Sequence, residues 1–252
     1  MSSSPQIISP DTSDTAGPAP VRYAITHLPS HIRLWLLTIL GLAADLWTKD
    51  WAFRSLDPTE SKIIFQNVCK LQLSLNPGAL FGLGAGMAPI FVGASVLALL
   101  FVFYLFANSG ASRWSMHFAL GLVLAGALGN LYDRITQEAF VAYTSRGRDI
   151  GIVLNETESS ITLGDFPNGG HRRPPYLKSE LGAGSSRQPV VRDFIKIEAK
   201  IGSFSLWPWI FNIADALLVV GVGILLLNFW LDRGHYQRQE DAVSSMEDPS
   251  ET

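Results

Sequence analysis

Residues Leu206–Leu231 read LWPWIFNIADALLVVGVGILLLNFWL, an apolar run that contains one carboxylate, Asp215. A run of about 20 apolar residues is long enough to span a bilayer as a helix. A charged side chain in the middle of such a span costs roughly 3 kcal/mol on insertion scales, so it is rare unless it serves a function. No Lys or Arg lies three or four residues from Asp215 to neutralise it on its own helix. The pattern therefore predicts that this acid is functional.

Three further segments have the length and composition of membrane spans, approximately Ile32–Phe53, Ala88–Ala107 and Trp114–Ile135. We therefore predict an all-α integral membrane protein, a bundle of four transmembrane helices with a small β-containing periplasmic element in the first outer loop. The β element is expected because β-branched and alternating residues fill much of Lys62–Leu73, just before the turn sequence Asn76-Pro77-Gly78.

The flanking charges predict the orientation of the spans. Arg33, Arg113 and Arg233 lie at span ends on one side, which the positive-inside rule assigns to the cytoplasm. Both termini are then cytoplasmic, and the two long loops lie on the outer side. A net charge of -3 indicates no nucleic-acid partner. The single cysteine, Cys69, permits no intramolecular disulfide and no cysteine-based metal site, and we expect no metal and no cofactor.

The composition changes along the chain predict three parts. Residues 1–30 are rich in Ser, Pro and Thr and are expected to form a disordered N-terminal tail. Residues 31–235 form the four-helix membrane domain, and residues 236–252 a disordered acidic C-terminal tail. Within the domain, residues 138–188 form a polar insertion in the second outer loop, in which we find no sustained hydrophobic period.

The predicted spans contain more polar side chains than passive anchors need. Asp45 and Lys49 are four residues apart and share one helical face, with the acid N-terminal to the base. A rise of about 1.5 Å per residue places Asp215 roughly 13 Å below the outer end of its span. The other polar residues are also expected in the outer half of the membrane: Asn130, Asp133, Arg134 and Asn212. A purely structural role remains open for these residues. Asp45 could pair with Lys49 and Asp133 with Arg134, and the asparagines could serve only as interhelical hydrogen-bond partners.

A second carboxylate, Asp193, lies upstream of the fourth span in the stretch Val190–Ile195. If Asp193 and Asp215 approach within hydrogen-bonding range in a low-dielectric site, they share one proton, and the pKa of one of them rises. The ionised acid then takes a proton from water while the protonated acid polarises a carbonyl. The motifs Gly-x-Ser-x-Gly and His-Glu-x-x-His are absent. Direct water attack by an aspartate pair is the chemistry that this pattern favours.

Five sequence motifs, taken in their order along the chain, resemble lipoprotein signal peptidase, also called signal peptidase II. They are DLWTK (Asp45–Lys49), NPGALFG (Asn76–Gly82), GALGNLYDR (Gly126–Arg134), VRDF (Val191–Phe194) and FNIAD (Phe211–Asp215). The resemblance covers all four predicted spans and the first outer loop.

The resemblance implies an aspartic endopeptidase of the bacterial inner membrane, with its active site towards the periplasmic leaflet. It would remove the signal peptide from a prolipoprotein, cutting before a cysteine that carries a diacylglyceryl group. Asp193 and Asp215 match the catalytic dyad of the family. Residues that match its substrate-binding or dyad-supporting positions are Asp45, Lys49, Asn76, Gly126, Asn130, Asp133, Arg134 and Asn212. The expected partners are the prolipoprotein and membrane lipids, and the protein is expected to act as a monomer without a cofactor.

The chain departs from the family pattern in two places. Family members pass from the Asp133-Arg134 motif to the Asp193 motif over a much shorter loop, and Ala216 stands where Ser is more common. Because the insertion touches no motif, we expect that it can be trimmed without abolishing cleavage.

Two other functions remain as alternatives. A proton-coupled carrier would use Asp45, Asp133 and Asp215 as a relay, and would show solute flux without peptide cleavage. A membrane scaffold with inert buried pairs would become more stable when Asp215 is neutralised. The lack of internal repeats and the small number of spans argue against the carrier.

Overall fold

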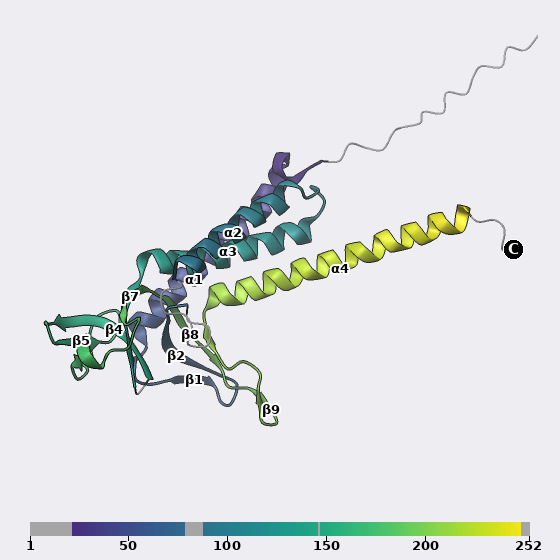
Figure 1. Ribbon diagram of the computed structural model, residues 1–252. Helices are drawn as coiled ribbons and strands as arrows, with labels where there is room; N and C mark the ends of the chain where they lie inside the picture. Colours follow the sequence, from purple (N-terminus) through teal and green to yellow (C-terminus); the bar gives the residue numbers. More distant parts are fainter. Residues whose placement is uncertain (1–21, 79–87, 146, 248–252) are drawn as a thin grey trace, which may run out of the picture.

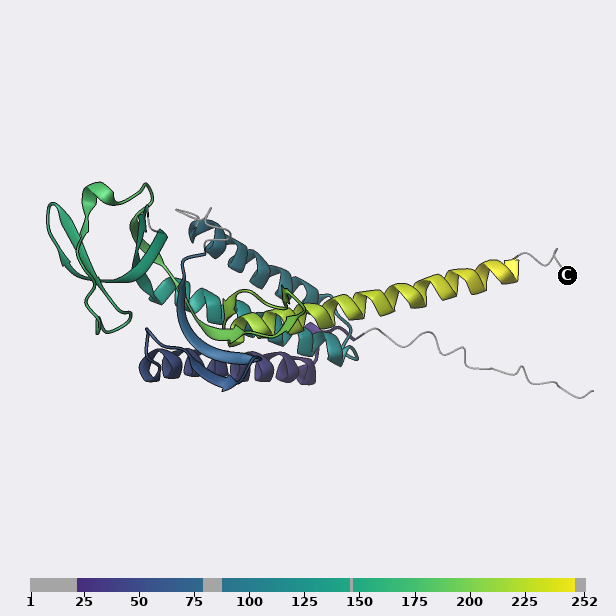
Figure 2. The same cartoon turned by 90° about the horizontal axis from the view of Figure 1, so that it is seen from below.

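The computed structural model describes residues 22–78, 88–145 and 147–247 (Figure 1). Its long helices are α1 (Leu28–Ser55), α2 (Ala88–Ala107), α3 (Trp114–Thr136) and α4 (Ile213–Glu247), and a 3-10 helix, η1 (Ala24–Thr26), precedes α1. The helix α3 packs against each of the other three. Figures 1 and 2 show α4 starting beside the strands and extending beyond the other helices.

The helix α3 is the centre of the bundle, and most of its residues from Met116 to Gly129 are buried. Two of its glycines permit close helix contacts. A Cβ atom at Gly126 would lie 2.4 Å from the carbonyl oxygen of Ala214, and one at Gly129 would lie 2.4 Å from Oδ2 of Asp45. Small residues of this kind let helix backbones approach in membrane proteins. The glycines therefore set how closely α1 and α4 approach α3.

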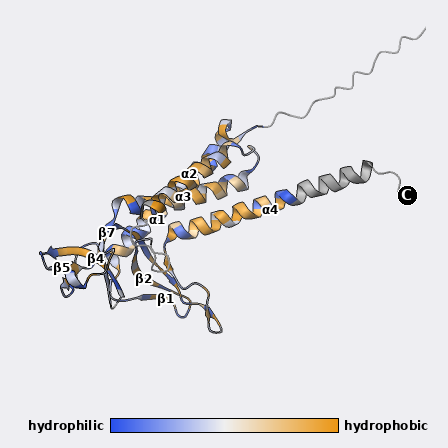
Figure 3. Ribbon diagram, in the orientation of Figure 1, coloured by the Kyte–Doolittle hydropathy of each residue, from blue (hydrophilic) through white to orange (hydrophobic). Residues whose placement is uncertain are grey.

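Hydrophobic residues make up much of the described helices (Figure 3), and many of their large side chains are exposed. Large exposed side chains on them include Ile39, Leu97, Leu226 and Trp230. Among the described residues, Trp114–Thr136 and Ile213–Arg233 are helices long and apolar enough to cross a membrane, and Val92–Ala107 is a shorter apolar helix. The helix α1 corresponds to the first predicted span, but it contains the charged residues Asp45 and Lys49.

A four-stranded antiparallel sheet lies at one end of the bundle, in the order β1-β2-β8-β11. Its strands are β1 (Lys62–Phe65), β2 (Cys69–Asn76), β8 (Val191–Ile197) and β11 (Ile210–Phe211). The strands expected from the first outer loop and from the stretch after Val190 are confirmed. Because β8 and β11 come from the second outer loop and its end, both outer loops build this sheet.

The insertion folds into a second antiparallel sheet of five strands, in the order β6-β5-β4-β3-β7. The strands are β3 (Glu138–Thr144), β4 (Gly147–Glu156), β5 (Ser160–Gly164), β6 (Tyr176–Leu177) and β7 (Ser186–Pro189), with a 3-10 helix, η2 (Lys178–Glu180), after β6. A third sheet is the hairpin of β9 (Lys200–Ile201) and β10 (Phe204–Ser205). In both views the insertion lies at the opposite end from the C-terminus (Figures 1 and 2).

The prediction of an all-α bundle with only a small β element is wrong, because three sheets accompany the four helices. The insertion has its own apolar core, in which Phe140, Ala142, Ile161 and Leu163 are buried together. These residues belong to short apolar runs separated by polar and glycine-rich segments. Each short apolar run, taken alone, is compatible with a buried strand. Over the whole insertion, the polar segments between the runs leave no regular hydrophobic period, so the strands were not predicted.

The fourth helix begins later than predicted. Residues Leu206–Pro208 carry no helix, Ile210 and Phe211 pair with β8, and α4 starts at Ile213. Pro208 disfavours a helical residue before it, and the pairing of Ile210 and Phe211 with β8 keeps those residues extended, so the helix starts after them. Asp215 consequently lies in the first turn of α4 rather than deep within a span.

Parts of the sequence prediction fall outside the described residues. These parts are most of the N-terminal tail (1–21), the glycine-rich segment 79–87 and the last residues, 248–252. The described portions of the predicted tails contain η1, the start of α1 and the end of α4. The proposed division of the chain into three parts stays a prediction.

A larger side chain at Gly126 should separate α3 from α4. We expect Gly126→Leu to lower the free energy of unfolding by roughly 1–3 kcal/mol, because overpacking forces neighbouring backbone to shift. Gly223→Leu on α4 is the matched control, since a Cβ atom at Gly223 meets nothing within 4 Å. Thermal unfolding of the detergent-solubilised protein measures both variants. Equal losses of stability would contradict the close contact at Gly126.

Candidate active site

Asp215 is held by a reciprocal pair of hydrogen bonds at the start of α4. The backbone N–H of Asp215 donates to Oδ1 of Asn212 at 3.0 Å, and the backbone N–H of Asn212 donates to Oδ2 of Asp215 at 3.2 Å. This arrangement is a capping box, which satisfies two N–H groups that a helix N-terminus leaves without helical partners. The helix dipole also favours a negative charge here. The FNIAD motif thus starts the helix and orients the Asp215 carboxylate.

Asp193 lies on β8 and is only 2% exposed. The side-chain amide of Asn212 donates to its Oδ1 at 2.7 Å, and the Asn76 side chain also forms a hydrogen bond with it. Burial raises the pKa of Asp193 to about 8, and the nearby negative charge of Asp215 acts in the same direction. The Asp193 carboxyl therefore favours its protonated form at neutral pH.

Two asparagines connect the carboxyl groups. Asn130 on α3 donates from Nδ2 to Oδ1 of Asp215 at 2.7 Å, and its own Oδ1 accepts from Nδ2 of Asn212 at 3.2 Å. Asn212 thereby contacts Asp193 and Asp215 at once. The amides from α3 and from the start of α4 bring a strand carboxyl and a helix carboxyl into one hydrogen-bonded cluster.

Lys49 is a fully buried cation beneath this cluster. Its Nζ lies 2.7 Å from Oδ2 of Asp45, 3.3 Å from Oδ2 of Asp133 and 3.2 Å from Oδ1 of Asn130. Asp45 and Lys49 thus form an ion pair, and whether its role is structural or functional stays a prediction. Asp45 has a second contact, because its Oδ1 accepts the backbone N–H of Ala214 at 2.8 Å. The pair therefore links α1 to both α3 and the N-terminus of α4.

Asp133 binds an arginine that the sequence reasoning did not select. Nη2 of Arg192 lies 2.7 Å from Oδ1 of Asp133, and the backbone N–H of Arg192 donates to Oδ2 at 2.9 Å. Both side chains are almost completely buried. Arg134, the predicted partner, lies within electrostatic reach of Asp193, Asp215 and Asp133. The position of Arg192 beside Asp193 in the VRDF motif is the one sequence signal for its role.

The structure brings together the residues that the sequence predicted from distant segments. Asn76, Asp193 and Asp215 meet through hydrogen bonds, and Asp45, Lys49 and Asp133 lie beside them. Gly126 contributes by its lack of a side chain, where α3 meets Ala214. Within residues 22–78, 88–145 and 147–247, no group of three or more His, Cys, Asp and Glu residues is placed to hold a metal ion.

Comparison with known proteins gives one family. The model of the family described as Signal peptidase (SPase) II matches residues 37–231. A lipoprotein signal peptidase of Rhodopirellula baltica is 32% identical over 197 residues, which cover 76% of this chain and 68% of the relative. A lipoprotein signal peptidase of Desulfitobacterium hafniense is 28% identical over 173 residues, 69% of this chain and 76% of the relative.

Two solved structures share the fold. A bacterial membrane enzyme determined by the in meso method at 2.3 Å resolution superposes with a TM-score of 0.54 and 20% identity, and covers 85% of this chain and 94% of its own. A second such structure, at 1.9 Å resolution, gives a TM-score of 0.52 over 83% of this chain and 96% of its own.

The buried Asp133–Arg192 pair should contribute strongly to stability. We expect Arg192→Met to lower the free energy of unfolding by about 3–5 kcal/mol, because the buried Asp133 carboxylate loses its closer cation and keeps only Lys49, which it shares with Asp45. Arg54→Met is the control, since the Arg54–Asp50 pair is 71% and 49% exposed, and exposed pairs contribute about 1 kcal/mol or less. Chemical denaturation in detergent compares the two. Similar losses would show that Arg192 is not part of a buried network.

Proposed function

The chain belongs to the signal peptidase II family, and we propose that it cuts diacylglyceryl-modified prolipoproteins before the lipidated cysteine with Asp193 and Asp215 as its catalytic dyad. Membership of the family makes the protein a membrane peptidase that acts on prolipoproteins. The observation that carries the aspartic mechanism is the contact of one residue, Asn212, with both carboxyl groups.

The different surroundings of the two acids support different roles for them. Asp193 is buried and favours the protonated form, so it donates a hydrogen bond to the scissile carbonyl oxygen. Asp215 is less buried and lies in the first turn of α4, where the helix dipole favours the carboxylate. Asp215 then accepts a proton from the attacking water.

The water attacks the carbonyl carbon while Asp193 gives its proton to the carbonyl oxygen, which produces a tetrahedral diol. Collapse of the diol breaks the C–N bond, and the amino group of the cysteine takes the proton that Asp215 holds. The proton of the hydroxyl group that becomes the new carboxyl group returns to Asp193. The cycle needs no covalent intermediate.

The surrounding network keeps the dyad in place. Asn130 and Asn212 donate to Asp215, while Asn76 and Asn212 donate to Asp193. Arg134 adds positive charge near both acids. We assign these residues, with Asp45, Lys49 and Asp133, to supporting the dyad or positioning substrate, because they surround the dyad from α1, α3, β2 and the residue that caps α4.

The apolar outer faces of the helices support a position in the bacterial inner membrane. A substrate with a transmembrane signal peptide and acyl chains then reaches the site laterally from the bilayer. We propose that all four helices span the membrane, with both termini cytoplasmic and the dyad towards the periplasmic leaflet. The protein works there as a monomer among membrane lipids.

Asp193→Asn and Asp215→Asn should each lower the rate of cleavage of a diacylglyceryl-modified prolipoprotein by roughly a hundredfold to ten-thousandfold, the range for loss of a general acid or base. A gel-shift assay of signal-peptide removal in proteoliposomes measures the rate. Asp50→Asn, which changes an exposed carboxylate on α1, should leave it unaltered. Full activity of either dyad variant would refute the assigned roles.

The rate constant for cleavage should fall as the pH rises through about 8, because Asp193 then loses the proton that it must donate. The groups that face Asp193 are Asp215, Asn212 and Asn76, with the charges of Lys49 and Arg134 nearby. Initial rates at saturating substrate, measured across neutral and alkaline pH, test this prediction. A rate that stays constant well above pH 8 would show that protonated Asp193 is not required.

A further inference from the structure

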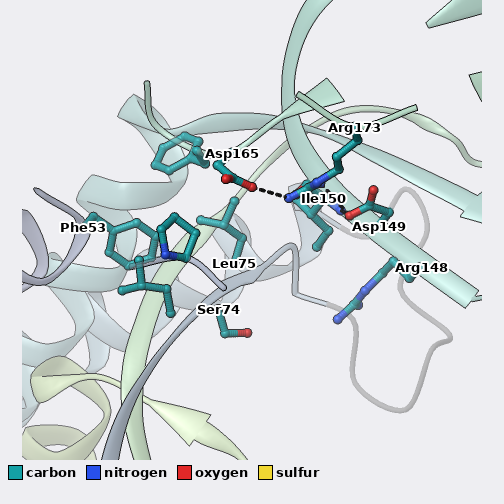
Figure 4. Close-up of a pocket in the computed structure, with 11 residues that line it drawn as sticks. Phe53, Ser74, Leu75, Arg148, Asp149, Ile150, Asp165 and Arg173 are labelled. Atoms are coloured by element: carbon teal, nitrogen blue, oxygen red, sulfur yellow. Dashed lines mark hydrogen bonds and ion pairs between the residues drawn. The ribbon is translucent and has the colours of Figure 1, made fainter. Parts of the chain in front are cut away.

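A polar cleft separates the insertion from the four-stranded sheet. It has a volume of about 310 Å³. One wall is the end of β2, with Ser74 and Leu75, and the other comes from β4 and the residues that follow β5 in the insertion (Figure 4). The cleft is therefore present in this chain because the insertion is present.

The cleft is next to the proposed catalytic dyad. Ser74 on β2 lies directly opposite Asp193 on β8 in the antiparallel register. Side chains of directly opposed residues lie on the same face of a sheet, with Cβ atoms about 5 Å apart. Ser74 therefore belongs to the cleft and is an immediate neighbour of Asp193.

The insertion is fixed against the rest of the protein. The ring of Phe166, after β5, packs edge-on against Phe53 at the outer end of α1, with the ring centres 5.9 Å apart. Ile150 of β4 packs into the same apolar cluster as Leu75 of β2. The two ends of the insertion also meet, because the backbone N–H of Val190 donates to the carbonyl oxygen of Gln137 at 3.1 Å. The cleft wall is thus held by packing from two strands and a helix.

One charge in the cleft remains available for a ligand. Arg173 binds Asp149 at 2.6 Å and Asp165 at 2.9 Å, as Figure 4 shows, and the Tyr176 hydroxyl also donates to Asp149. Arg173 therefore has two carboxylate partners, and both acids are hydrogen-bonded to Arg173 rather than to Arg148. Arg148 lines the same cleft and is exposed, and none of the described acidic side chains forms an ion pair with it. An incoming carboxylate can pair with it without displacing an existing partner.

We propose that this cleft binds the segment of the prolipoprotein that follows the lipidated cysteine, and that Arg148 selects acidic side chains in it. The inference rests on the proposed function, because it needs the cut to occur at Asp193. The signal peptide and acyl chains stay with the apolar helices, so the polar segment after the cut must leave on the side of the sheets. The cleft beside Ser74 lies on that side and presents a cation.

Three matched prolipoproteins test the proposal in proteoliposomes that contain the full-length protein. They differ in the segment directly after the cysteine, which is rich in serine, in aspartate or in lysine. The readout is the ratio of kcat/KM between the aspartate and serine substrates, with the difference expected in KM. We expect Arg148→Ala to lower this ratio by roughly three- to tenfold, as for loss of one solvent-accessible charged contact. Arg148→Glu should shift the preference towards the lysine substrate.

Two further variants serve as comparisons. Arg187→Ala removes an exposed arginine of β7 outside the cleft and should leave the ratio unchanged. Replacing residues 138–189 by a short linker between Gln137 and Val190 should abolish the aspartate preference while cleavage continues.

The outcomes separate this proposal from the proposed function. An unchanged ratio in Arg148→Ala, or an equal change in Arg187→Ala, would overturn the role of Arg148 although the wild-type protein still cleaves. A wild-type protein that cuts none of the substrates would overturn the proposed function, and the cleft proposal with it.

Discussion

The hydrogen bonds at the N-terminus of α4 are the constraint on which the rest of the site depends. A helix that begins next to a buried cluster leaves N–H groups that must find partners, because no water reaches them there. Here Asn212 and Asp215 satisfy each other, and Asp45 accepts the N–H of Ala214. The same contacts that allow the helix to start also orient Asp215. The carboxylate that caps the helix is therefore also the one proposed to take part in catalysis.

Buried ion pairs connect the strands to the helices. Lys49 lies between Asp45 and Asp133, and Asp133 also binds Arg192 of β8. Removing Lys49 would leave Asp45 buried without a cation, and removing Asp133 would leave Arg192 buried without an anion, which is unfavourable in a low-dielectric interior. Because Arg192 directly precedes Asp193, the ion pair with Asp133 fixes the strand that carries the buried acid. The glycines of α3 permit the close approach that these short contacts require.

The sequence singled out residues that the structure places close together, but it misjudged part of the fold around them. Carboxylates and amides in apolar segments are conspicuous, and the ordered motifs linked Asp45, Asn130, Asp193 and Asp215 before any contact was known. The insertion was misjudged, because strands as short as β5 and β6 carry too few residues to show a period. Their stability comes from pairing with neighbours. The start of α4 was misplaced for a related reason: the apolar run continues through Pro208 and β11, and hydropathy does not distinguish a buried strand from a helix.

The central claim is that Asp193 keeps at neutral pH the proton that it gives to the scissile carbonyl oxygen. Infrared difference spectroscopy of the full-length protein in lipid, comparing wild type with Asp193→Asn, observes the carbonyl stretch of a protonated carboxyl group directly. The account predicts a band at neutral pH that the variant lacks and that disappears as the pH passes about 8. A wild-type spectrum without a protonated carboxyl band attributable to Asp193 at neutral pH would contradict it.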